Sequence, residues 1–299
     1  MHESKKGGSM KLGALEAGGT KMVCAIGDET GKIFEQTSIP TTTPDETISA
    51  CIDYFRDKDI EALGIACFGP IDLDRNSDTY GYITTTPKPG WANVDIVGKV
   101  KAKLNVPIGF DTDVNGSLLG EVTYGDSKGL TDAVYFTIGT GIGAGVISGG
   151  NLVHGMMHPE AGHMLMVPRE DDKYRGHCPF HGTCLEGMAA GPAIEERWGA
   201  KGVELADRDE VWDLEAYYIA QAMVNCIMVL SPQRIILGGG VMHQEQLFPL
   251  VRKKTEEMLH EYIKTPQMKD LDHYIVPASL NDDQGIMGCL KLALDELGA

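Results

Sequence analysis

Residues 11–26 read KLGALEAGGTKMVCAI, and residues 133–147 read AVYFTIGTGIGAGVI. Each stretch consists of two short apolar runs on either side of a turn rich in glycine and threonine, the pattern of a β-hairpin. Helix and strand patterns alternate after each hairpin, so the sequence carries a faint internal echo. A duplicated α/β unit predicts two lobes with a cleft between them, where ligands commonly bind. The alternative is a chance likeness between two glycine-rich hairpins.

Composition places the chain among globular proteins and limits its partners. The chain has 299 residues, of which 42% are hydrophobic and 23% charged. Its formal net charge of −17 argues against nucleic acid and anionic membranes as partners, because both are bound through Lys and Arg. No apolar run approaches the roughly 20 residues that cross a bilayer.

The N-terminus and the cysteines indicate the compartment. Residues 1–9 are rich in Lys, Gly and Ser and lack the apolar stretch of a secretory signal. We expect a disordered leader or a cloning remnant there, with the fold starting near Met10. The seven cysteines are odd in number and lack the spacing of a disulfide framework. A reducing compartment, the cytoplasm, is therefore expected.

The two hairpin turns also predict a phosphate site. The sequence has no P-loop motif, and the dinucleotide-like pattern of Gly139–Ala144 is followed by strand residues where a helix is required. Glycines allow backbone N–H groups to close on phosphate oxygens, and Thr20 and Thr140 add hydroxyls. Gly18-Gly19-Thr20 and Gly139-Thr140-Gly141 together therefore predict a grip on one polyphosphate, although tight hairpins need glycine in any case.

Asp113 is the candidate for acid–base chemistry. It follows the predicted strand Pro107–Phe110, which places its carboxylate at the rigid edge of a sheet. A carboxylate there can accept the proton of a hydroxyl that attacks phosphorus. Asp111 and Asp113 point to opposite sides if extended, so only one can face the site. The alternative is that Asp113 caps a helix beginning at Val114.

A helix start is predicted at Thr43. Thr43 and Glu46 have the spacing of a capping box, and Pro44 suits the first helical position. Apolar residues then recur at helical spacing as far as Phe55.

The segment Cys178-Pro179-Phe180-His181-Gly182-Thr183-Cys184 carries the residue types that bind metals. Cys, His and Cys at intervals of three suit a tetrahedral zinc knuckle that needs a fourth ligand. Histidines lie upstream at positions 154, 158, 163 and 177. Four protein ligands would close the shell, so the zinc would be structural. The alternatives are incidental Cys and His residues in a loop, or a disulfide.

Glu160, His163 and Glu186 surround the same segment. Short polar groups that accept and donate hydrogen bonds are what a polyhydroxylated sugar requires. If His163 is a zinc ligand, the metal would fix the loop that carries both carboxylates. Solvated surface carboxylates are the other interpretation.

Together these motifs resemble the ROK family of sugar kinases and sugar-responsive repressors, across the chain from Met10 onward. Glu16-Ala17-Gly18-Gly19-Thr20-Lys21 and Gly139-Thr140-Gly141-Ile142-Gly143 look like the family's two phosphate motifs. Gly69-Pro70-Ile71-Asp72 and Pro89-Gly90-Trp91 look like its sugar-side loops. The stretch Asp111–Gly116 resembles the catalytic segment, which implies that Asp113 is the general base.

The stretch His158–His163 resembles the family signature G-E-x-G-H, and Cys184–Gly187 its C-x-E ending. This resemblance implies a zinc site of His163, Cys178, His181 and Cys184. It implies sugar contacts by Gly69, Thr112, Asp113, Glu160, His163 and Glu186. It implies ATP or phosphate contacts by Glu16, Gly18, Gly19, Thr20, Lys21, Thr140, Gly141, Gly239 and Gly240.

Three positions depart from the family pattern. Glu16 stands where Asp is usual, Thr112 where Asn is frequent, and His158 in place of the first Gly of G-E-x-G-H. With the Cys-Pro-x-His-Gly-x-Cys-Leu-Glu-Gly knuckle, these variants look like the bacterial fructokinase branch.

The resemblance implies an α/β, two-lobed actin-like fold of the hexokinase and ribonuclease H type, with an interlobe cleft and a zinc-binding loop. We expect a small domain at 10–118, joined by a C-terminal helix at about 284–299. The large domain is expected at 119–283, with the zinc-binding segment at 158–187. Mg²⁺ with ATP, structural Zn²⁺ and a homodimer are further implications.

The expected activity is ATP-dependent phosphorylation of D-fructose to fructose 6-phosphate. Kinases for glucose, mannose or an N-acetylhexosamine are alternatives, as is a non-catalytic sugar-binding protein. A sugar-sensing repressor would need an N-terminal helix-turn-helix domain, for which the short leader leaves no room.

Overall fold

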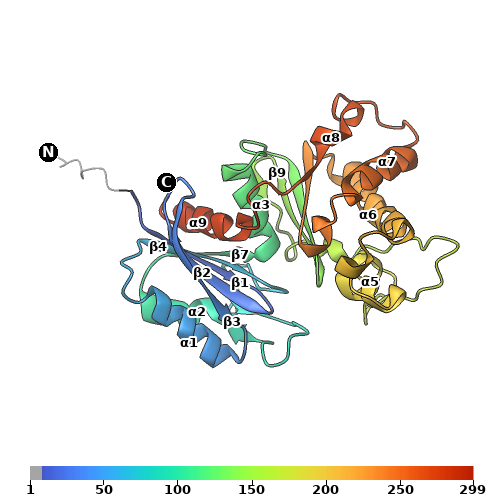
Figure 1. Ribbon diagram of the computed structural model, residues 1–299. Coiled ribbons are helices and arrows are strands. Elements are labelled where there is room, and N and C mark those ends of the chain that lie inside the picture. Colours follow the sequence, from blue (N-terminus) through green and yellow to red (C-terminus); the bar gives the residue numbers. More distant parts are fainter. Residues whose placement is uncertain (1–8, 299) are drawn as a thin grey trace. The chain divides into compact units, whose positions relative to one another are not determined.

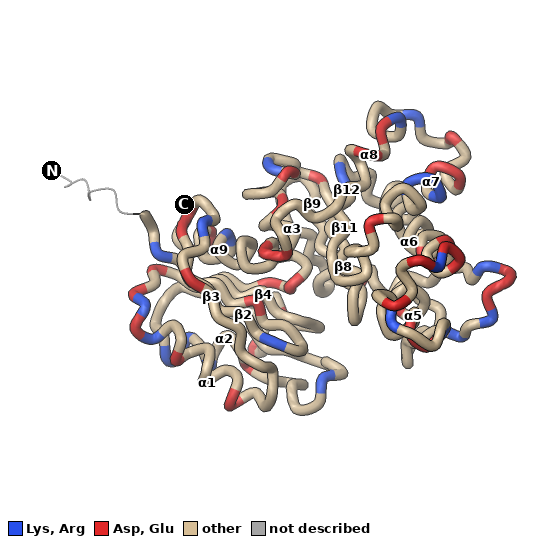
Figure 2. The backbone as a smooth tube through the Cα atoms, in the orientation of Figure 1, with Lys and Arg blue, Asp and Glu red and all other residues tan. Residues whose placement is uncertain are grey.

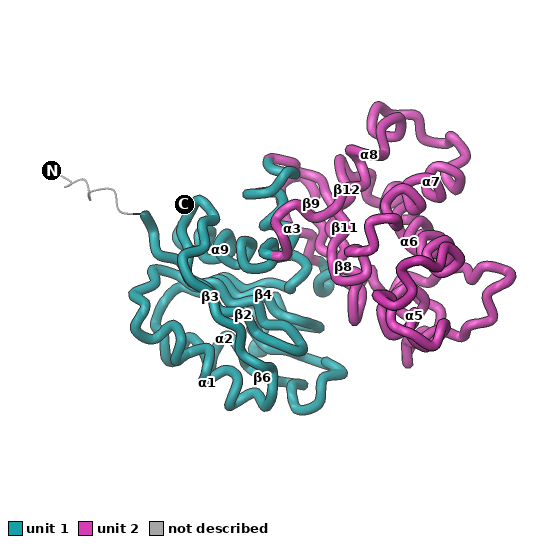
Figure 3. The backbone as a smooth tube through the Cα atoms, in the orientation of Figure 1, with its two compact units in different colours: residues 1–128, 155–158, 283–299 teal, residues 129–154, 159–282 magenta. Residues whose placement is uncertain are grey.

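The computed structural model describes residues 9–298, which separate into two units (Figure 3). Unit 1 contains the described residues up to Lys128, Gly155–His158, and those from Asp283 onward; unit 2 contains Gly129–His154 and Pro159–Asp282. The expected leader lies outside the described residues except for Ser9, whose hydroxyl donates to Glu29. The expected domain boundary at residue 118 falls inside a helix of unit 1.

Unit 1 is built on a five-stranded sheet in the order β3-β2-β1-β4-β7. Its strands are β1 (Leu12–Ala17), β2 (Lys21–Gly27), β3 (Ile33–Pro40), β4 (Ala62–Cys67) and β7 (Ile108–Thr112). The first three strands pair antiparallel, and β4 and β7 continue parallel to β1. β1 and β4 are almost wholly buried, and apart from Glu16 their residues are apolar or glycine.

Unit 2 repeats this plan. Its sheet has the order β10-β9-β8-β11-β12. Its strands are β8 (Ala133–Ile138), β9 (Ile142–Ser148), β10 (Asn151–Leu152), β11 (Arg234–Gly238) and β12 (Ile275–Pro277). Again an antiparallel trio is followed by two strands parallel to its first member. The internal echo seen in the sequence is therefore confirmed as a shared topology.

Helices cover both faces of the first sheet (Figure 1). They are α1 (Pro44–Phe55), α2 (Ile96–Leu104), α3 (Asp113–Tyr124) and α9 (Gln284–Glu296). α1 and α2 lie on one face, where their apolar sides join a core that includes Phe55, Trp91 and Ile96. α9 lies on the other face and packs against α3, β1 and β4. A two-stranded ribbon, β5 (Tyr82–Ile83) and β6 (Val94–Asp95), precedes α2.

The longest helix of unit 2 is α6 (Asp209–Leu230). The other α-helices of this unit are α4 (Leu185–Ala189), α5 (Gly191–Trp198), α7 (Leu247–Leu259) and α8 (Leu271–Tyr274). α6 packs against α7 and α4 and buries large side chains such as Trp212, Tyr218 and Met223. Single-turn 3₁₀ helices occur at Ala161–His163, Gly202–Leu205, Gly240–His243 and Gln267–Lys269.

Charge is spread over both units rather than gathered in one of them. Acidic residues outnumber basic ones by 43 to 26 in the whole sequence, and Figure 2 shows both kinds on each unit. Within residues 9–298, every helix is too short or too polar to span a bilayer.

The predicted helix start at Thr43 is right in position but wrong in mechanism. α1 begins at Pro44 with Thr43 as its N-cap residue, yet the side chain of Thr43 makes no capping bond to the backbone. Its hydroxyl donates instead to the carboxylate of Glu46 at 2.8 Å. The two side chains of the expected capping box have therefore paired with each other.

Glycines bring α9 into backbone contact with its neighbours. A Cβ atom placed on Gly288 of α9 would lie 1.7 Å from the carbonyl oxygen of Gly116 in α3. A Cβ atom on Gly64 of β4 would lie 1.8 Å from the carbonyl oxygen of Cys289 in α9. Such distances are impossible for real atoms, so only glycine allows helix and sheet to approach this closely.

We therefore expect Gly288→Ala to lower the free energy of unfolding by about 2–3 kcal/mol, since overpacking against backbone atoms cannot be relieved by a side-chain rotation. Lys291→Ala, on the same helix, is the control. It removes an i, i+4 pair with Asp295 and should cost no more than about 0.5 kcal/mol. Urea denaturation measures both; equal stabilities of Gly288→Ala and wild type would contradict the packing argument.

Candidate active site and metal centre

Asp113 stands at the junction of β7 and α3. The strand ends at Thr112 and the helix begins at Asp113, so a buried sheet and a helix both fix its backbone. Its Oδ1 atom accepts a hydrogen bond from the N–H of Val114 at 2.9 Å. Burial raises the pKa of Asp113 to about 6. The carboxylate is therefore ionised at neutral pH and more basic than an exposed aspartate, as a general base requires.

The residues next to Asp113 explain why it is not the helix cap. Thr112 is the N-cap of α3, and its hydroxyl oxygen accepts the N–H of Asn115 at 3.1 Å. Asp111 accepts from the side-chain amide of Asn115 at 2.7 Å and from the N–H of Thr112 at 2.8 Å. The alternative in which Asp113 caps a helix starting at Val114 is therefore wrong. Thr112, predicted as a sugar contact, is buried and engaged in capping.

The first glycine turn joins β1 to β2 and is open to solvent. Gly18 donates its N–H to the carbonyl of Lys21, and Gly19, Thr20 and Lys21 are exposed. Thr41 anchors the turn from beside it, since its hydroxyl donates to the carbonyl of Gly18 at 2.8 Å. The turn is thus held on one side and accessible on the other.

Glu16 lies on β1 just before this turn. A Cβ atom on Gly285, at the start of α9, would lie 2.2 Å from its Oε1 atom. The glycine therefore leaves room for the carboxylate of Glu16.

The second glycine turn joins β8 to β9 and gathers several predicted residues. The N–H of Ile142 donates to the Oε2 atom of Glu186 at 3.0 Å. A Cβ atom on Gly141 would lie 2.9 Å from the same oxygen, and one on Gly139 would lie 3.6 Å from the nitrogen of Gly240. Unit 2 therefore brings together this turn, Glu186 and the triplet after β11.

Gly239 is fixed by a close approach of its own. Its φ is +89°, and a Cβ atom there would lie 2.6 Å from the backbone nitrogen of Ile138. Glycine is therefore required for the β11 turn to lie against the end of β8.

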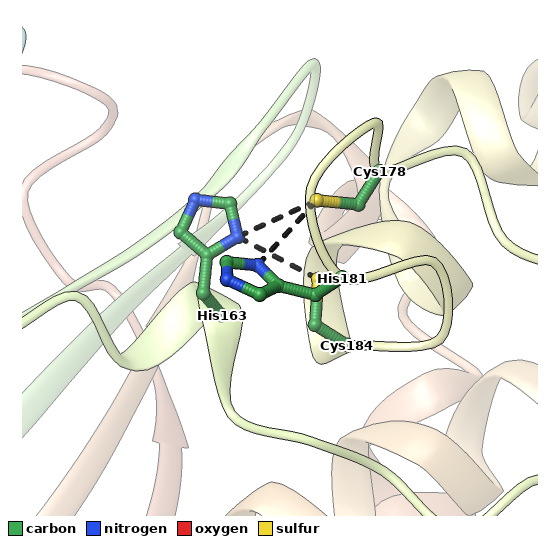
Figure 4. Close-up of side chains that lie close together, drawn as sticks. All are labelled: His163, Cys178, His181 and Cys184. Carbon is green, nitrogen blue, oxygen red and sulfur yellow. Dashed lines mark hydrogen bonds between the residues drawn. The ribbon is translucent and has the colours of Figure 1, made fainter. Parts of the chain in front are cut away.

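The Cys and His residues of the knuckle form one cluster (Figure 4). Potential ligand atoms of His163, Cys178, His181 and Cys184 all lie within 4.8 Å of one another. The Nδ1 atom of His163 is 3.5 Å from the Sγ of Cys184 and 3.8 Å from that of Cys178, which in turn is 3.7 Å from the Nδ1 of His181. In a tetrahedral zinc site, bonds of about 2.3 Å to sulfur and 2.0 Å to nitrogen put such atoms about 3.6 Å apart. The donor set and its spacing therefore fit a zinc ion.

Among the four upstream histidines, His163 is the one the structure adds to this cluster. His177 pairs its Nδ1 atom with the carboxylate of Glu196 at 2.8 Å, and His158 accepts the N–H of Ile71. Glu160, predicted as a sugar contact, is exposed and precedes the 3₁₀ helix that carries His163.

The metal cluster and the second glycine turn are linked through α4. The Sγ of Cys184 accepts the N–H of Gly187 and caps α4, while Glu186 in the first turn of the helix holds Ile142. Glu186, whose carboxylate holds the turn, thus comes two residues after Cys184 of the candidate metal cluster. This link joins positions far apart in the sequence, and no local pattern predicts it.

A second feature that the sequence did not predict anchors the segment before the knuckle. Arg197 of α5 and Asp172 approach to 3.3 Å with almost fully buried side chains. The hydroxyl of Tyr218 on α6 donates to Asp172 at 2.7 Å, and the guanidinium of Arg197 lies 4.5 Å from the ring centre of Tyr174. No role was predicted for Arg197 from the sequence, because the residues of this anchor lie far apart in the chain.

Comparison with known proteins identifies the family to which the chain is similar. Residues 12–296 match the family model described as ROK family. The fructokinases of Pediococcus pentosaceus and Streptococcus mutans are each 48% identical to this chain, over 284 and 291 residues. Each match covers 95% of this chain and 98% of the relative.

One solved structure shows the shared fold. A ROK family glucokinase from Streptomyces griseus, in complex with glucose and AMPPNP, superposes with a TM-score of 0.76 at 23% sequence identity. The match covers 95% of this chain and 99% of the glucokinase. The expected α/β kinase fold is thereby confirmed.

The cluster geometry predicts the effect of losing one ligand. Cys184→Ser should reduce bound zinc from about one ion per chain to well below one and lower the melting temperature by several degrees, because a structural zinc site contributes folding energy. Cys226 is a buried cysteine of α6 outside the cluster. Cys226→Ser is therefore the control, and the zinc content of this variant should equal that of wild type. Elemental analysis and calorimetry test this; full zinc content in Cys184→Ser would remove this residue from the site.

The raised pKa of Asp113 predicts a pH-dependent stability. Its folded pKa of about 6 exceeds the ordinary value of roughly 4, so the native state holds its proton more tightly. Stability from this group is full below about pH 4 and is lost as pH rises through about 6. Asp113→Asn should therefore be more stable than wild type at pH 7.5, by on the order of 2 kcal/mol after allowing for the part of the side chain that water reaches.

At pH 4 the advantage of Asp113→Asn should largely disappear. Urea denaturation at the two pH values measures the difference. An Asn variant that is less stable than wild type at pH 7.5 would contradict the assignment of a partly buried carboxylate with a raised pKa.

Proposed function

Because the chain belongs to the ROK family, we propose that it is a sugar kinase that transfers the terminal phosphate of ATP to fructose and forms fructose 6-phosphate. The observation that carries the proposal is the fixed, basic carboxylate of Asp113 in a chain 48% identical to two fructokinases. Fructose is preferred over other hexoses on the strength of these relatives.

In this proposal Asp113 is the general base. The 6-hydroxyl of the sugar gives its proton to the carboxylate, and its oxygen bonds to the terminal phosphorus of ATP. The bond from that phosphorus to the bridging oxygen breaks, and ADP leaves with the electron pair. Most of the rate comes from positioning and charge stabilisation, and the base adds a further factor.

The two glycine turns are proposed to bind the phosphates. Exposed backbone at Gly19 and Thr20, with the ammonium group of Lys21, offers donors on unit 1. Thr140 and Gly141 offer the corresponding donors on unit 2. Gly239 and Gly240, which the structure places beside the second turn, are assigned to the nucleotide on the same grounds.

Mg²⁺ accompanies ATP in this proposal and neutralises charge on its phosphates. Carboxylate oxygens are ligands that Mg²⁺ prefers, and Glu16 carries such oxygens directly before the first turn. The glycine at position 285 leaves space for them, so the residues present fit the ion.

His163 can serve the metal and the sugar together. Its Nδ1 atom faces both sulfurs of the cluster, so Nε2 lies on the opposite side of the ring. A neutral imidazole bound to a metal through Nδ1 carries its proton on Nε2 and donates from there. We assign this donor, with Glu160, Glu186 and the backbone at Gly69, to the hydroxyls of the hexose.

Zinc is the proposed occupant of the cluster. Two thiolates and two imidazoles are a common structural zinc set, and four protein ligands leave no open position for a reacting water. The ion then keeps His163 and the α4 segment in place and has no part in phosphoryl transfer. Glu186, two residues after Cys184, accepts the N–H of Ile142 and so holds the second glycine turn in place.

We further propose that the kinase works in the cytoplasm and as a homodimer. All seven cysteines are free thiols, which suits a reducing compartment. The dimer follows from the family resemblance alone and is tested by the mass of the protein in solution.

A coupled ADP-release assay tests the proposed function. Across fructose, glucose, mannose and N-acetylglucosamine, kcat/KM should be highest for fructose. Asp113→Asn should lower kcat by about 10²–10⁴ with unchanged zinc content. Asp78→Asn, an exposed carboxylate of the same unit, is the matched control and should keep full activity. Sugar binding without ADP release in the wild type would identify a non-catalytic sugar-binding protein instead.

A further inference from the structure

A four-residue strap connects the sugar-side turn of unit 1 to the metal-bearing part of the chain. The chain leaves unit 2 after His154, contributes Gly155–His158 to unit 1, and returns to unit 2 at Pro159. His158 is the last residue of the strap, and its side chain is buried. Glu160 and His163 follow it almost directly.

The side chain of His158 binds the backbone of the turn after β4. Its Nε2 atom accepts the N–H of Ile71 at 3.1 Å in a buried hydrogen bond. Because Nε2 is the acceptor, the ring is neutral and its proton lies on Nδ1. Pro159 restricts the backbone of His158, since a residue before proline is disfavoured in the helical region.

The same imidazole lies against Gly69. A Cβ atom on Gly69 would be 3.3 Å from the Cε1 atom of His158, tighter than ordinary contact. The remaining contacts of the turn come from its own sheet and loop. Phe68 donates its N–H to Ala17 at 2.9 Å, and Thr84 donates to the carbonyl of Pro70 with its N–H at 2.8 Å and its hydroxyl at 3.0 Å.

We propose that His158 is a positioning residue for the hexose, acting through the Gly69–Ile71 turn. The inference rests on the proposed function, which assigns Gly69 to the sugar. Without the Nε2 acceptor, the buried N–H of Ile71 has no partner at that place, and a buried unpaired donor is costly enough to move a turn. Sugar affinity then falls. Asp113 and both glycine turns lie on other segments, so nucleotide binding and the chemical step are spared.

His158 is separate from the metal cluster. The cluster of possible ligands consists of His163, Cys178, His181 and Cys184, and the Nε2 atom of His158 is already bonded to Ile71. Substitution of His158 should therefore leave zinc content unchanged, which distinguishes its role from that of His163.

Two amides of different length give the test. In His158→Gln the side-chain oxygen reaches as far as Nε2 and can accept the N–H of Ile71. In His158→Asn the oxygen ends at the position of Nδ1 and cannot. Because both variants are neutral and polar, the comparison isolates how far the side-chain oxygen extends. Steady-state kinetics should show KM for fructose raised about tenfold in His158→Asn and less than threefold in His158→Gln. In both, KM for ATP, kcat and zinc content should stay within twofold of wild type.

Several outcomes would overturn the inference. KM for fructose could be unchanged in His158→Asn, or it could rise as much in His158→Gln as in His158→Asn. KM for ATP could also rise as much as KM for fructose. If His158→Asn does not fold while His158→Gln folds and keeps its KM, the residue is structural and the inference fails.

The proposed function can fail separately. If the wild type phosphorylates another hexose instead of fructose, the same comparison is made with that hexose, and the inference stands or falls on its KM. If the wild type releases no ADP with any sugar, calorimetric dissociation constants for the sugar replace KM. If it binds no sugar at all, both the proposed function and the inference are wrong.

Discussion

The close packing of α9 against the first sheet constrains the positions of the candidate site residues of unit 1. Through glycines at 64, 116 and 288, the backbone of α9 lies directly against β4 and α3 at these positions. The strands beneath it lead to the candidate site residues: Glu16 lies next to the end of β1, the turn beginning with Gly69 follows β4, and Asp113 follows β7. Because these ends belong to one tightly packed layer, their side chains have little freedom to drift, which is what a site that relies on positioning needs.

Unit 2 reaches the same rigidity by a different route. Its second glycine turn is held by the carboxylate of Glu186, which lies in a short helix capped by Cys184 of the candidate metal cluster. Around this segment lies a buried ion pair between Arg197 and Asp172. A loop rich in glycine and polar residues has few apolar contacts with which to hold its shape, so the buried ion pair and the hydrogen bond of Glu186 take over that task.

The sequence predicted the features that local patterns encode. The hairpins around the glycine turns, the strand that leads to Asp113 and the cysteine–histidine knuckle each occupy a few adjacent residues. The predictions were wrong where a side chain had more than one possible partner nearby. Thr43 bonds to the side chain of Glu46 instead of the helix backbone. Thr112, and not Asp113, is the N-cap residue of α3. The bonds from Ile142 to Glu186 and from Ile71 to His158 span 44 and 87 residues. Pairings of that length follow from the tertiary fold, and the spacing of residue types does not contain them.

The place of α9 in the chain has a consequence for biosynthesis. Unit 1 begins with the first strands to be made, yet its last helix comes after the whole of unit 2. During synthesis, β1 and β4 are therefore made long before the helix that covers them. During that interval the nascent chain exposes a surface of the kind that chaperones bind. Unit 1 can thus be completed only after the last residues of unit 2 have been made.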